Sequence, residues 1–447
     1  MSGCGGGSDG GASASAAPPT ATFASLGSPC KANGGDVNIS VKASRTSGVA
    51  PLSVIFDATD TTAPARPFHN LIFSWNFGDT SAGAWSNGVN NLTSKNQATG
   101  AVAGHVFESA GVHTVSLTIN NGGDLSKCVA TLTVNVDSPD TYTGYAGAKT
   151  ACIGRALPIA GLNGCPVGAT AYVSDDAALT VDTVIKNALA GGSRRVLLQR
   201  GDTFSSSAPI TASLPGPVMI GAYGGNSAKP VINMPVLNSY LFNLRNAPTD
   251  WRFSNIDLNG LGTNVKFSVP NGTNLSDHIL FHKLTVRNSG GLSVGRTNVV
   301  VVDSQIGPIT GGSGNNGVWA SEAFGFYFAG NHINDTTAGE HGMRIQGAIK
   351  GAVNHNTFTN AAYTKQVFTL RGNDTVPFVT QYVVVSDNVF ELTKPSGDNW
   401  MTTISPQNTT RKEEIRDILV ERNLFRAVNG VSQALMISAS DVTVRNN

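Results

Sequence analysis

The strongest constraint on the fold is a short unit that recurs through the second half of the chain. Each unit has a brief apolar strand, two polar residues, a recurring position that is often Asn, and an apolar residue two positions later. The units are WRFSNIDL, ILFHKLTV, VVVDSQI, FYFAGNHI, GAVNHNTF, VVVSDNVF, ILVERNLF and VTVRNN, with the recurring position at Ile256, Leu284, Ser304, Asn331, Asn356, Asn388, Asn423 and Asn447. Units of roughly 20 to 35 residues cannot bury themselves singly, but they can stack.

Stacked units of this kind predict a parallel β-helix over residues 171–447. The Asn side chains would then form a ladder at the strand spacing of roughly 4.8 Å. Before the units, Val181, Val184, Ile185, Ala188 and Leu189 share one helical face, which predicts a short helix at 180–190 that caps the stack. The helix, VLLQRGDTF, IGAYGG and the Asn-turn coils resemble the right-handed β-helix of pectate-lyase-like proteins. Because the last unit stops at Asn447, we expect further C-terminal coils.

Residues 36–137 show a different pattern, in which apolar and polar residues alternate between turn clusters. This period of two predicts a small antiparallel, Ig-like β-sandwich, so that the whole chain is expected to be all-β. APLSVIFDAT, FSWNFGDT and HVFESAGVHTVSLTI resemble the sequence blocks of a PKD domain. Trp75 and Phe77 would face the core, and Gly78 and Asp79 would turn the chain. The resemblance implies a spacer or adhesion module without chemistry of its own.

The remaining segments indicate how the protein could be attached to the cell surface. Residues 1–35 are rich in Gly, Ser and Ala and predict a flexible tether, and residues 138–170 predict a linker. MSGC resembles the end of a bacterial lipoprotein signal with a lipidated Cys4, and a cloning start with a free Cys is the alternative. We expect disulfides between Cys152 and Cys165 and between Cys30 and Cys128.

Two such disulfides fit an oxidising compartment, so we expect a monomer that is secreted or held at the outer cell surface by a lipid anchor in the membrane. Charged residues make up 13% of the chain and the net charge is +1, without a basic run, so nucleic acid is not an expected partner. No apolar segment reaches the roughly 20 residues that span a bilayer.

A group of basic residues in two successive units suggests a binding site. In MRIQG and VFTLRG the apolar neighbours would point inward, which turns Arg344 and Arg371 outward on one face. Like charges on adjacent strands repel, but a carboxylate or sulfate bound between them makes the net interaction favourable. His341, Lys365 and Tyr363 could line the same patch, and Lys350 could add to the binding of substrate. We therefore expect an acidic polysaccharide as partner.

The segment from His341 to Arg371 also resembles the alginate-lyase-type block of β-helix polysaccharide lyases. Such coils carry a Lys as base and a Leu-Arg pair, and Arg371 matches the latter. Arg344 stands where the Lys would be, and an Arg is not readily deprotonated. The resemblance implies β-elimination of a uronate-containing glycan, with the two arginines stabilising negative charge, His341 or Lys365 as base and Tyr363 as acid.

Other activities and cofactors have less support in the sequence. Calcium could assist through Glu340, Asp335 or Asp374, although no dense acidic cluster is present, and no other cofactor or metal is indicated. An inverting hydrolase needs two outward carboxylates, and no such Asp/Glu pair stands on equivalent strands. The alternative to a lyase is a carbohydrate-binding surface adhesin or structural β-helix protein without catalysis.

Overall fold

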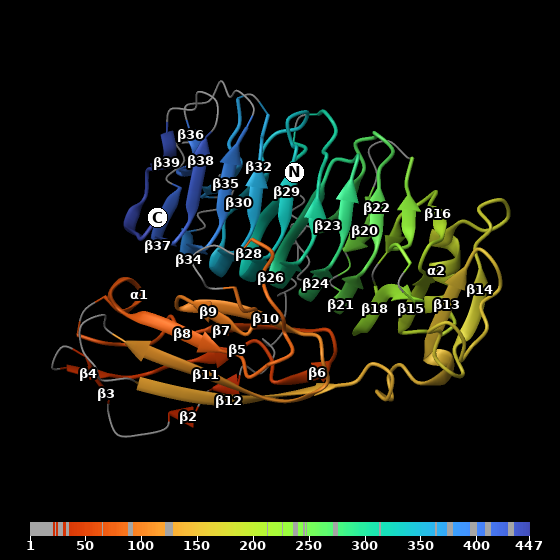
Figure 1. The fold of residues 1–447 in the computed structure, drawn as a ribbon, viewed down its shortest axis with the longest axis horizontal. Coiled ribbons are helices and arrows are strands. Elements are labelled where there is room, and N and C mark those ends of the chain that lie inside the picture. Colours follow the sequence, from red (N-terminus) through yellow and green to blue (C-terminus); the bar gives the residue numbers. More distant parts are fainter. Residues whose placement is uncertain are drawn as a thin grey trace, which may run out of the picture.

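The computed structural model shows two β-domains lying side by side (Figure 1). It describes residues 21–447 apart from 23, 26–29, 33–34, 65, 88–92, 121–127, 212, 226, 236–239, 245, 247, 271–275, 313, 363, 373–378, 394–399, 407–412 and 428–432. The N-terminal domain is an antiparallel sandwich, and the larger domain is a parallel β-helix. Among the described residues, none of the helices combines the length and apolar character needed to cross a bilayer.

The sandwich has two antiparallel sheets and an additional strand pair. One sheet has the order β1 (Ala21–Thr22), β5 (Lys42–Ala43), β7 (Leu52–Asp57) and β10 (Val102–Phe107). The other has β2 (Ala24–Ser25), β12 (Cys128–Asp137), β11 (Gly111–Asn120), β8 (Ile72–Asn76) and β9 (Gln97–Thr99), with β6 (Ser47–Val49) on β12. A helix α1 (Pro67–Asn70) and the pair β3 (Cys30–Ala32) and β4 (Gly35–Val37) complete it. Strands β1 to β3 lie in the segment expected to be a tether, so the strands start earlier than predicted.

The sandwich core is built on aromatic side chains. Trp75 and Phe77 are both buried, as predicted, and pack with Phe56 at ring-centroid distances of 5.5 Å. The Trp75 indole N–H donates to the Gly100 carbonyl at 2.8 Å, which satisfies its one polar group. Gly78 has a φ of +67°, a conformation that favours Gly at this turn.

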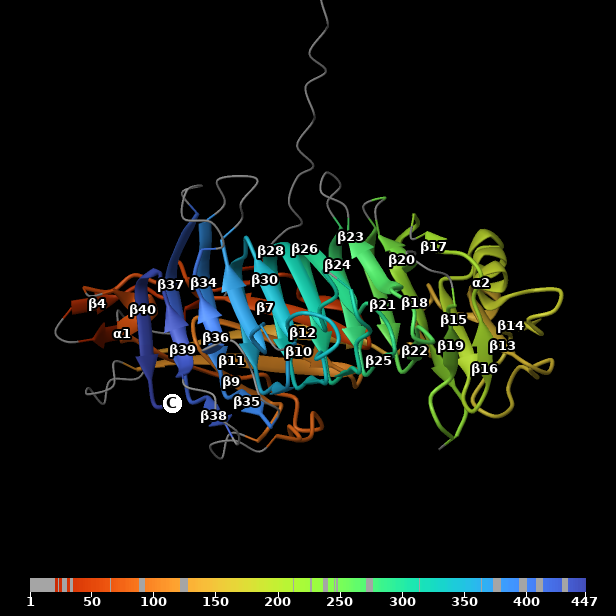
Figure 2. The same cartoon turned by 90° about the horizontal axis from the view of Figure 1, so that it is seen from above.

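The second domain is a right-handed parallel β-helix whose strands form three faces (Figure 2). We call the first the docking face: β13 (Thr150–Gly154), β15 (Arg195–Gln199), β18 (Pro215–Tyr223), β21 (Thr249–Ser254), β24 (Asp277–His282), the C-terminal parts of β26 (Leu292–Val302) and β28 (Val318–Ala329), β31 (Ile349–Asn354), β34 (Val379–Ser386), β37 (Glu414–Glu421) and β40 (Ser440–Arg445). Strand β14 (Thr170–Val173) pairs with β13 at the end of this sheet.

The other two faces complete each coil. The basic face contains β17 (Ile210–Thr211), β20 (Tyr240–Leu244), β23 (Lys266–Pro270), the N-terminal parts of β26 and β28, β30 (Met343–Gln346), β33 (Phe368–Arg371), β36 (Trp400–Ile404) and β39 (Gln433–Ile437). The third face contains β16 (Thr203–Ser205), β19 (Val231–Asn233), β22 (Asp257–Asn259), β25 (Thr285–Arg287), β27 (Gln305–Ile306), β29 (His332–Asn334), β32 (Thr357–Thr359), β35 (Val389–Leu392) and β38 (Leu424–Ala427). Strands β26 and β28 are long enough to join the docking and basic faces.

The sequence suggested that the β-helix starts at residue 171, but its first coil begins earlier. A short 3-10 helix, η2 (Gly147–Lys149), leads into β13, and Cys152 of β13 forms the predicted disulfide with Cys165. Helix α2 (Val181–Ala190) then covers the end of the stack, and its five predicted apolar side chains are all buried in the β-helix core. Part of the expected linker therefore belongs to the β-helix.

The predicted Asn ladder is present at the turn between the docking and third faces. Asn331, Asn356, Asn388 and Asn423 are buried. Along the ladder, each side-chain oxygen accepts from the amide nitrogen and the backbone N–H of the Asn one coil earlier, at 2.8–3.0 Å. Each of these amides also donates to a backbone carbonyl. The ladder satisfies buried polar groups that could not otherwise leave water without a large cost.

The sandwich packs directly on the docking face. Eight outward side chains of that face are buried in one apolar cluster with the sandwich core: Leu280, Val300, Val302, Tyr327, Ala329, Ala352, Val384 and Leu419. Close fit is visible at Gly104 of β10, where an added Cβ would lie 2.3 Å from Cγ of Tyr327. The sandwich is thus docked along the β-helix, in contrast to the spacer that the sequence resemblance implied.

Ion pairs surround this apolar contact. Arg45 pairs with Asp250 at 2.5 Å, and Lys95 pairs with Asp303 at 2.6 Å. Glu108 of the sandwich contacts His282 at 3.4 Å and Lys283 of the β-helix. Burial raises the pKa of Glu108, but the hydrogen bonds and charges of His282 and Lys283 outweigh burial and lower it to about 2. The paired charges fix where the sandwich sits on the docking face.

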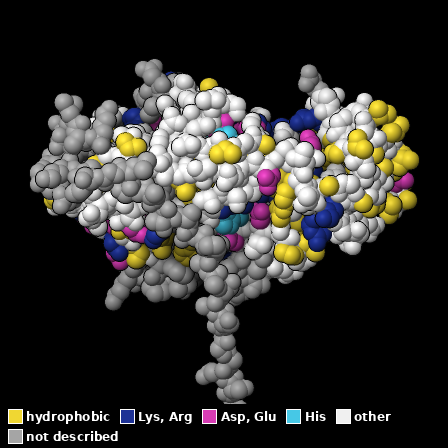
Figure 3. All heavy atoms as spheres, turned by 90° about the horizontal axis from the view of Figure 1, so that it is seen from below, with side chains coloured by type: hydrophobic (Ala, Val, Ile, Leu, Met, Phe, Trp, Pro, Cys, Tyr) yellow, Lys and Arg dark blue, Asp and Glu magenta, His cyan; other side chains and the backbone are white. Residues whose placement is uncertain are grey.

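The cap end of the molecule exposes aliphatic side chains. Viewed from below, hydrophobic side chains gather at that end (Figure 3). Leu157, Ile159 and Leu162 are exposed in the loop that Cys152 and Cys165 close, and the exposed Val167 follows it.

Candidate functional site

The centre of the candidate site is a pair of arginines on adjacent strands of the basic face. Met343, Ile345 and their partners in β33 are buried in the core, so the alternate residues point outward. Strand β30 pairs with β33 such that Arg344 lies opposite Thr369 and Gln346 opposite Arg371. The two guanidinium groups therefore start from neighbouring coils, offset by two residues along the strand.

Neutral side chains are among the hydrogen-bond partners of both arginines. Arg344 Nη2 donates to Gln346 Oε1 at 3.0 Å, and Arg371 Nε donates to Thr369 Oγ1 at 3.0 Å. The hydroxyl of Thr369 in turn lies 2.8 Å from that of Thr403 in the next coil. The hydrogen bonds of Arg371 thus extend through Thr369 to the next coil, whereas that of Arg344 with Gln346 stays within its own strand.

His341 lies at the edge of the arginine pair, immediately before β30. Its side chain is only 2% exposed, and Nδ1 is 3.1 Å from the Gln366 carbonyl. Burial lowers the pKa of His341 to about 3, and the charges of Arg371, Arg344 and Lys365 act in the same direction. The ring is therefore neutral at pH 7. The Gln366 backbone N–H also lies 3.2 Å from Nδ1 and donates to it in the tautomer that keeps the ring proton on Nε2. In the other tautomer Nδ1–H donates to the Gln366 carbonyl, and Nε2 carries no proton and can accept one.

Lys365 and Glu340 lie on the loop side of the same site. The ammonium of Lys365 is 4.0 Å from Glu340 Oε1, and the backbone N–H of Ala362 donates to the Glu340 carbonyl at 3.1 Å. The positive charge of Lys365 acts on His341 in the same direction as the charges of the two arginines, and lowers its pKa.

The basic face also carries two residues that the sequence reasoning missed, Lys266 and Trp319. Trp319 lies opposite Arg344 in the β28–β30 pairing and points outward because Val318 and Ala320 are buried in the core. The Lys266 ammonium lies 5.5 Å from the centre of the Trp319 ring. The sequence VWAS gives little signal for Trp319, because Val318, Trp319 and Ala320 are all apolar and the alternation appears only in their burial.

Lys350 does not lie in this cluster, and its expected role in substrate binding is wrong. Its ammonium is 2.7 Å from Asp57 and 3.5 Å from Asp60, both in the sandwich, so Lys350 is part of the docking contact. The physical reason is its φ of +59°, because a left-handed residue at the corner between two faces does not follow strand alternation.

Several other expected site residues lie outside the described residues. They are Tyr363, Asp374, Cys4 and the side chain of Cys30, while Cys128 is disulfide-bonded.

The expected calcium ligands do not form a metal-binding group within the described ranges. Asp335 accepts a hydrogen bond from Thr337 at 2.5 Å, and Glu340 is engaged with Lys365. In the part of the chain that the structure describes, three potential ligands converge at Glu108, His282 and Asp303, with ligand atoms within 4.8 Å of one another. Lys283 and Lys95 already neutralise the two carboxylates, so this group serves the docking contact.

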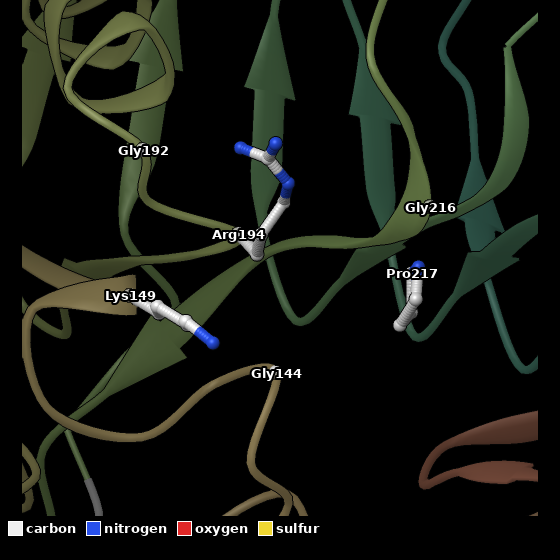
Figure 4. A pocket seen from close by; sticks show the side chains of 6 residues that line it. All are labelled: Gly144, Lys149, Gly192, Arg194, Gly216 and Pro217. Carbon is white, nitrogen blue, oxygen red and sulfur yellow. The ribbon is translucent and has the colours of Figure 1, made fainter.

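A second basic pocket of about 290 Å³ lies at the cap end, between the linker and the start of β18 (Figure 4). Lys149 and Arg194 border it, but their side chains extend in different directions in the view. Lys149 donates to the Thr143 carbonyl and Arg194 to the Ser193 carbonyl. Two cations that do not converge are a weaker anion site than the arginine pair of the basic face.

Comparison with known proteins adds to this description. The family model for the PKD domain matches residues 39–136. Compared with curated proteins, the chain matches none. Among solved structures it is similar to an alginate lyase from Paenibacillus sp. str. FPU-7, with 12% identity, a TM-score of 0.35, and coverage of 60% of this chain and 94% of that chain.

Two further solved structures are similar at the same low level. The A-module of the Azotobacter vinelandii mannuronan C-5 epimerase AlgE6 is 14% identical, with a TM-score of 0.25 and coverage of 59% and 94%. Tailspike protein 3 of bacteriophage CBA120 is 11% identical, with a TM-score of 0.24 and coverage of 60% and 59%. Likeness at this level does not assign an activity, so function has to be argued from the residues of the basic face.

Proposed function

We propose that the protein binds acidic polysaccharide on its basic face and cleaves it by β-elimination next to a uronate carboxylate. The observation that carries this proposal is the arrangement of Arg344 and Arg371 on adjacent strands beside the neutral, buried imidazole of His341. Two guanidinium groups can share one carboxylate, and the neutral imidazole next to them can accept a proton.

The charges support binding of an anion at this place. Arg344 and Arg371 lie on neighbouring strands, offset by two residues, so that one anion could lie between their guanidinium groups. Lys365 lies at the edge of the site, where it pairs with Glu340 at 4.0 Å. A bound carboxylate would accept charge-assisted hydrogen bonds from both guanidinium groups.

The chemistry follows from the same geometry. With the uronate carboxylate held by the arginines, Nε2 of His341 removes the proton from the adjacent ring carbon. The electron pair forms the new carbon–carbon double bond, the carbon–oxygen bond to the leaving sugar breaks, and the glycosidic oxygen takes up a proton from water. The protonated imidazole returns its proton to solvent after the elimination. The arginines stabilise the negative charge that develops on the carboxylate in the transition state. Since their charges help to depress the pKa of His341, a bound carboxylate also makes the imidazole a stronger base.

A location outside the cell fits this substrate. The disulfide between Cys152 and Cys165 closes the loop at the cap end, and disulfides persist in oxidising compartments. We include in the proposal that the protein is secreted or held at the outer surface, where acidic polysaccharide is accessible.

A second candidate function is binding without cleavage, as in a surface adhesin. The observation that favours it is the burial of His341, which leaves 2% of the residue exposed and holds its pKa at about 3. A base of such low pKa removes a carbon-bound proton slowly unless substrate binding raises the pKa.

The test is ultraviolet absorbance of unsaturated uronate ends during incubation with alginate, pectate and glycosaminoglycans. Wild type, Arg371→Ala, His341→Gln and the control Arg426→Ala would be compared; Arg426 lies on the third face, 3.4 Å from Glu391. We expect absorbance to rise with wild type and the control, and to be lost in the other two variants. Binding of an acidic glycan without any rise would favour the adhesin, and no binding at all would refute both candidates.

A further inference from the structure

We infer that Lys266 and Trp319 form a second subsite, so that the basic face binds a run of consecutive uronates lying along the axis of the β-helix. The inference rests on the proposed function and specifies its substrate. Trp319 pairs with Arg344 on one side and with Ser293 on the other, and Arg344 pairs with Thr369. These outward side chains form one row across four coils.

Lys266 supplies the charge of this subsite. Its ammonium donates to the Gly314 carbonyl at 3.1 Å and lies over the Trp319 ring. Within the described ranges, no acidic side chain forms an ion pair with Lys266. Burial lowers the pKa of Lys266, and the charge of Glu340 partly opposes that effect. A partly buried ammonium without a carboxylate partner is a site where an anion of the ligand gains a strong contact.

Trp319 supplies a flat apolar surface beside that charge. It is partly exposed, whereas the neighbouring Val318 and Ala320 are fully buried. A sugar ring presents a face of C–H groups, which can pack on an indole much as other apolar groups do. Trp319 would therefore hold the ring of a sugar unit whose carboxylate reaches Lys266.

The spacing of the strands sets how the two subsites are connected. Strands β28, β30 and β33 are successive neighbours, so Trp319 and Arg371 are separated by two strand spacings, or roughly 10 Å across the sheet, and by two residues along the strand. A single sugar unit does not bridge that distance, whereas neighbouring units of one chain do. Because both subsites are cationic, adjacent units of the preferred substrate carry carboxylates, in contrast to glycans that alternate acidic and neutral units.

The experiment is calorimetric binding of uronate dimers, tetramers and hexamers, and of chondroitin hexamers as an alternating glycan. The variants are Trp319→Ala, Trp319→Phe and Lys266→Met, with Arg426→Ala as a control on the third face and Arg371→Ala as a control for the arginine subsite. For uronate hexamers, we expect Trp319→Ala and Lys266→Met each to weaken affinity about tenfold. Trp319→Phe should retain most of the affinity, and the variants should bind dimers as wild type does.

The outcomes separate this inference from the proposed function. If Trp319→Ala and Lys266→Met bind hexamers as tightly as wild type while Arg371→Ala does not bind, the second subsite is refuted and the proposed function stands. Equal affinity of wild type for uronate and chondroitin hexamers would refute the preference for consecutive uronates. If wild type binds no acidic glycan, the proposed function fails, and this inference fails with it.

Discussion

The docking of the sandwich can be tested with a single added methyl group. Gly104 lies in β10, and a Cβ there would come within 2.3 Å of Cγ and 2.7 Å of Cβ of Tyr327. The contact involves the base of a buried ring on a β-strand, so neither side can move easily. Overpacking of this kind typically costs about 1–3 kcal/mol. We expect Gly104→Ala to lower the free energy of unfolding by that amount.

The assay is urea denaturation, with limited proteolysis to detect release of the sandwich. Gly225→Ala is the matched control, because a Cβ at Gly225 meets no atom within 4 Å. The control should stay within about 0.5 kcal/mol of wild type. Tyr327→Ala alone should cost about 3–5 kcal/mol by leaving a cavity. Combined with it, Gly104→Ala should cost much less than in wild type, because the clashing ring is gone.

Wild-type stability of Gly104→Ala would refute the described contact between β10 and β28. Full additivity of the effects of Gly104→Ala and Tyr327→Ala on the free energy of unfolding would also refute the contact, because residues in contact are expected to be energetically coupled.

Two further predictions concern the Asn ladder and the ion pairs. Asn388→Ala should lower the free energy of unfolding by about 1–3 kcal/mol, because it leaves ladder partners buried without hydrogen bonds, and urea denaturation would measure it. Glu108 has a folded-state pKa of about 2, below its ordinary value of 4.5. Its contribution to stability is therefore present above pH 4.5 and is lost as the pH falls towards 2. Glu108→Gln should make the acid dependence of the denaturation midpoint shallower, and an unchanged dependence would contradict this.

Sequence reasoning worked where structure depends on local periodicity. The Asn ladder repeats at one position per coil, and Trp75 and Phe77 alternate with polar residues along one strand, so both were predictable from spacing alone. Lys350 was assigned to the wrong contact because its backbone is left-handed, and strand alternation fails at such a corner. Lys266 and Trp319 were missed because they come together from different coils, 53 residues apart in the sequence, and spacing within one unit does not show such a contact.

The sequence also contains a pattern that indicates the docking of the sandwich. Strands exposed on one face alternate apolar and polar residues, whereas strands buried on both faces are apolar throughout. The docking-face segments VVVV (299–302), VVV (383–385) and ILV (418–420) are of the second kind, which indicates that something covers their outer side. The sandwich covers the outer side of these strands. Because it occupies the docking face, it leaves Arg344 and Arg371 on another side of the β-helix, where a long polysaccharide can approach without displacing it.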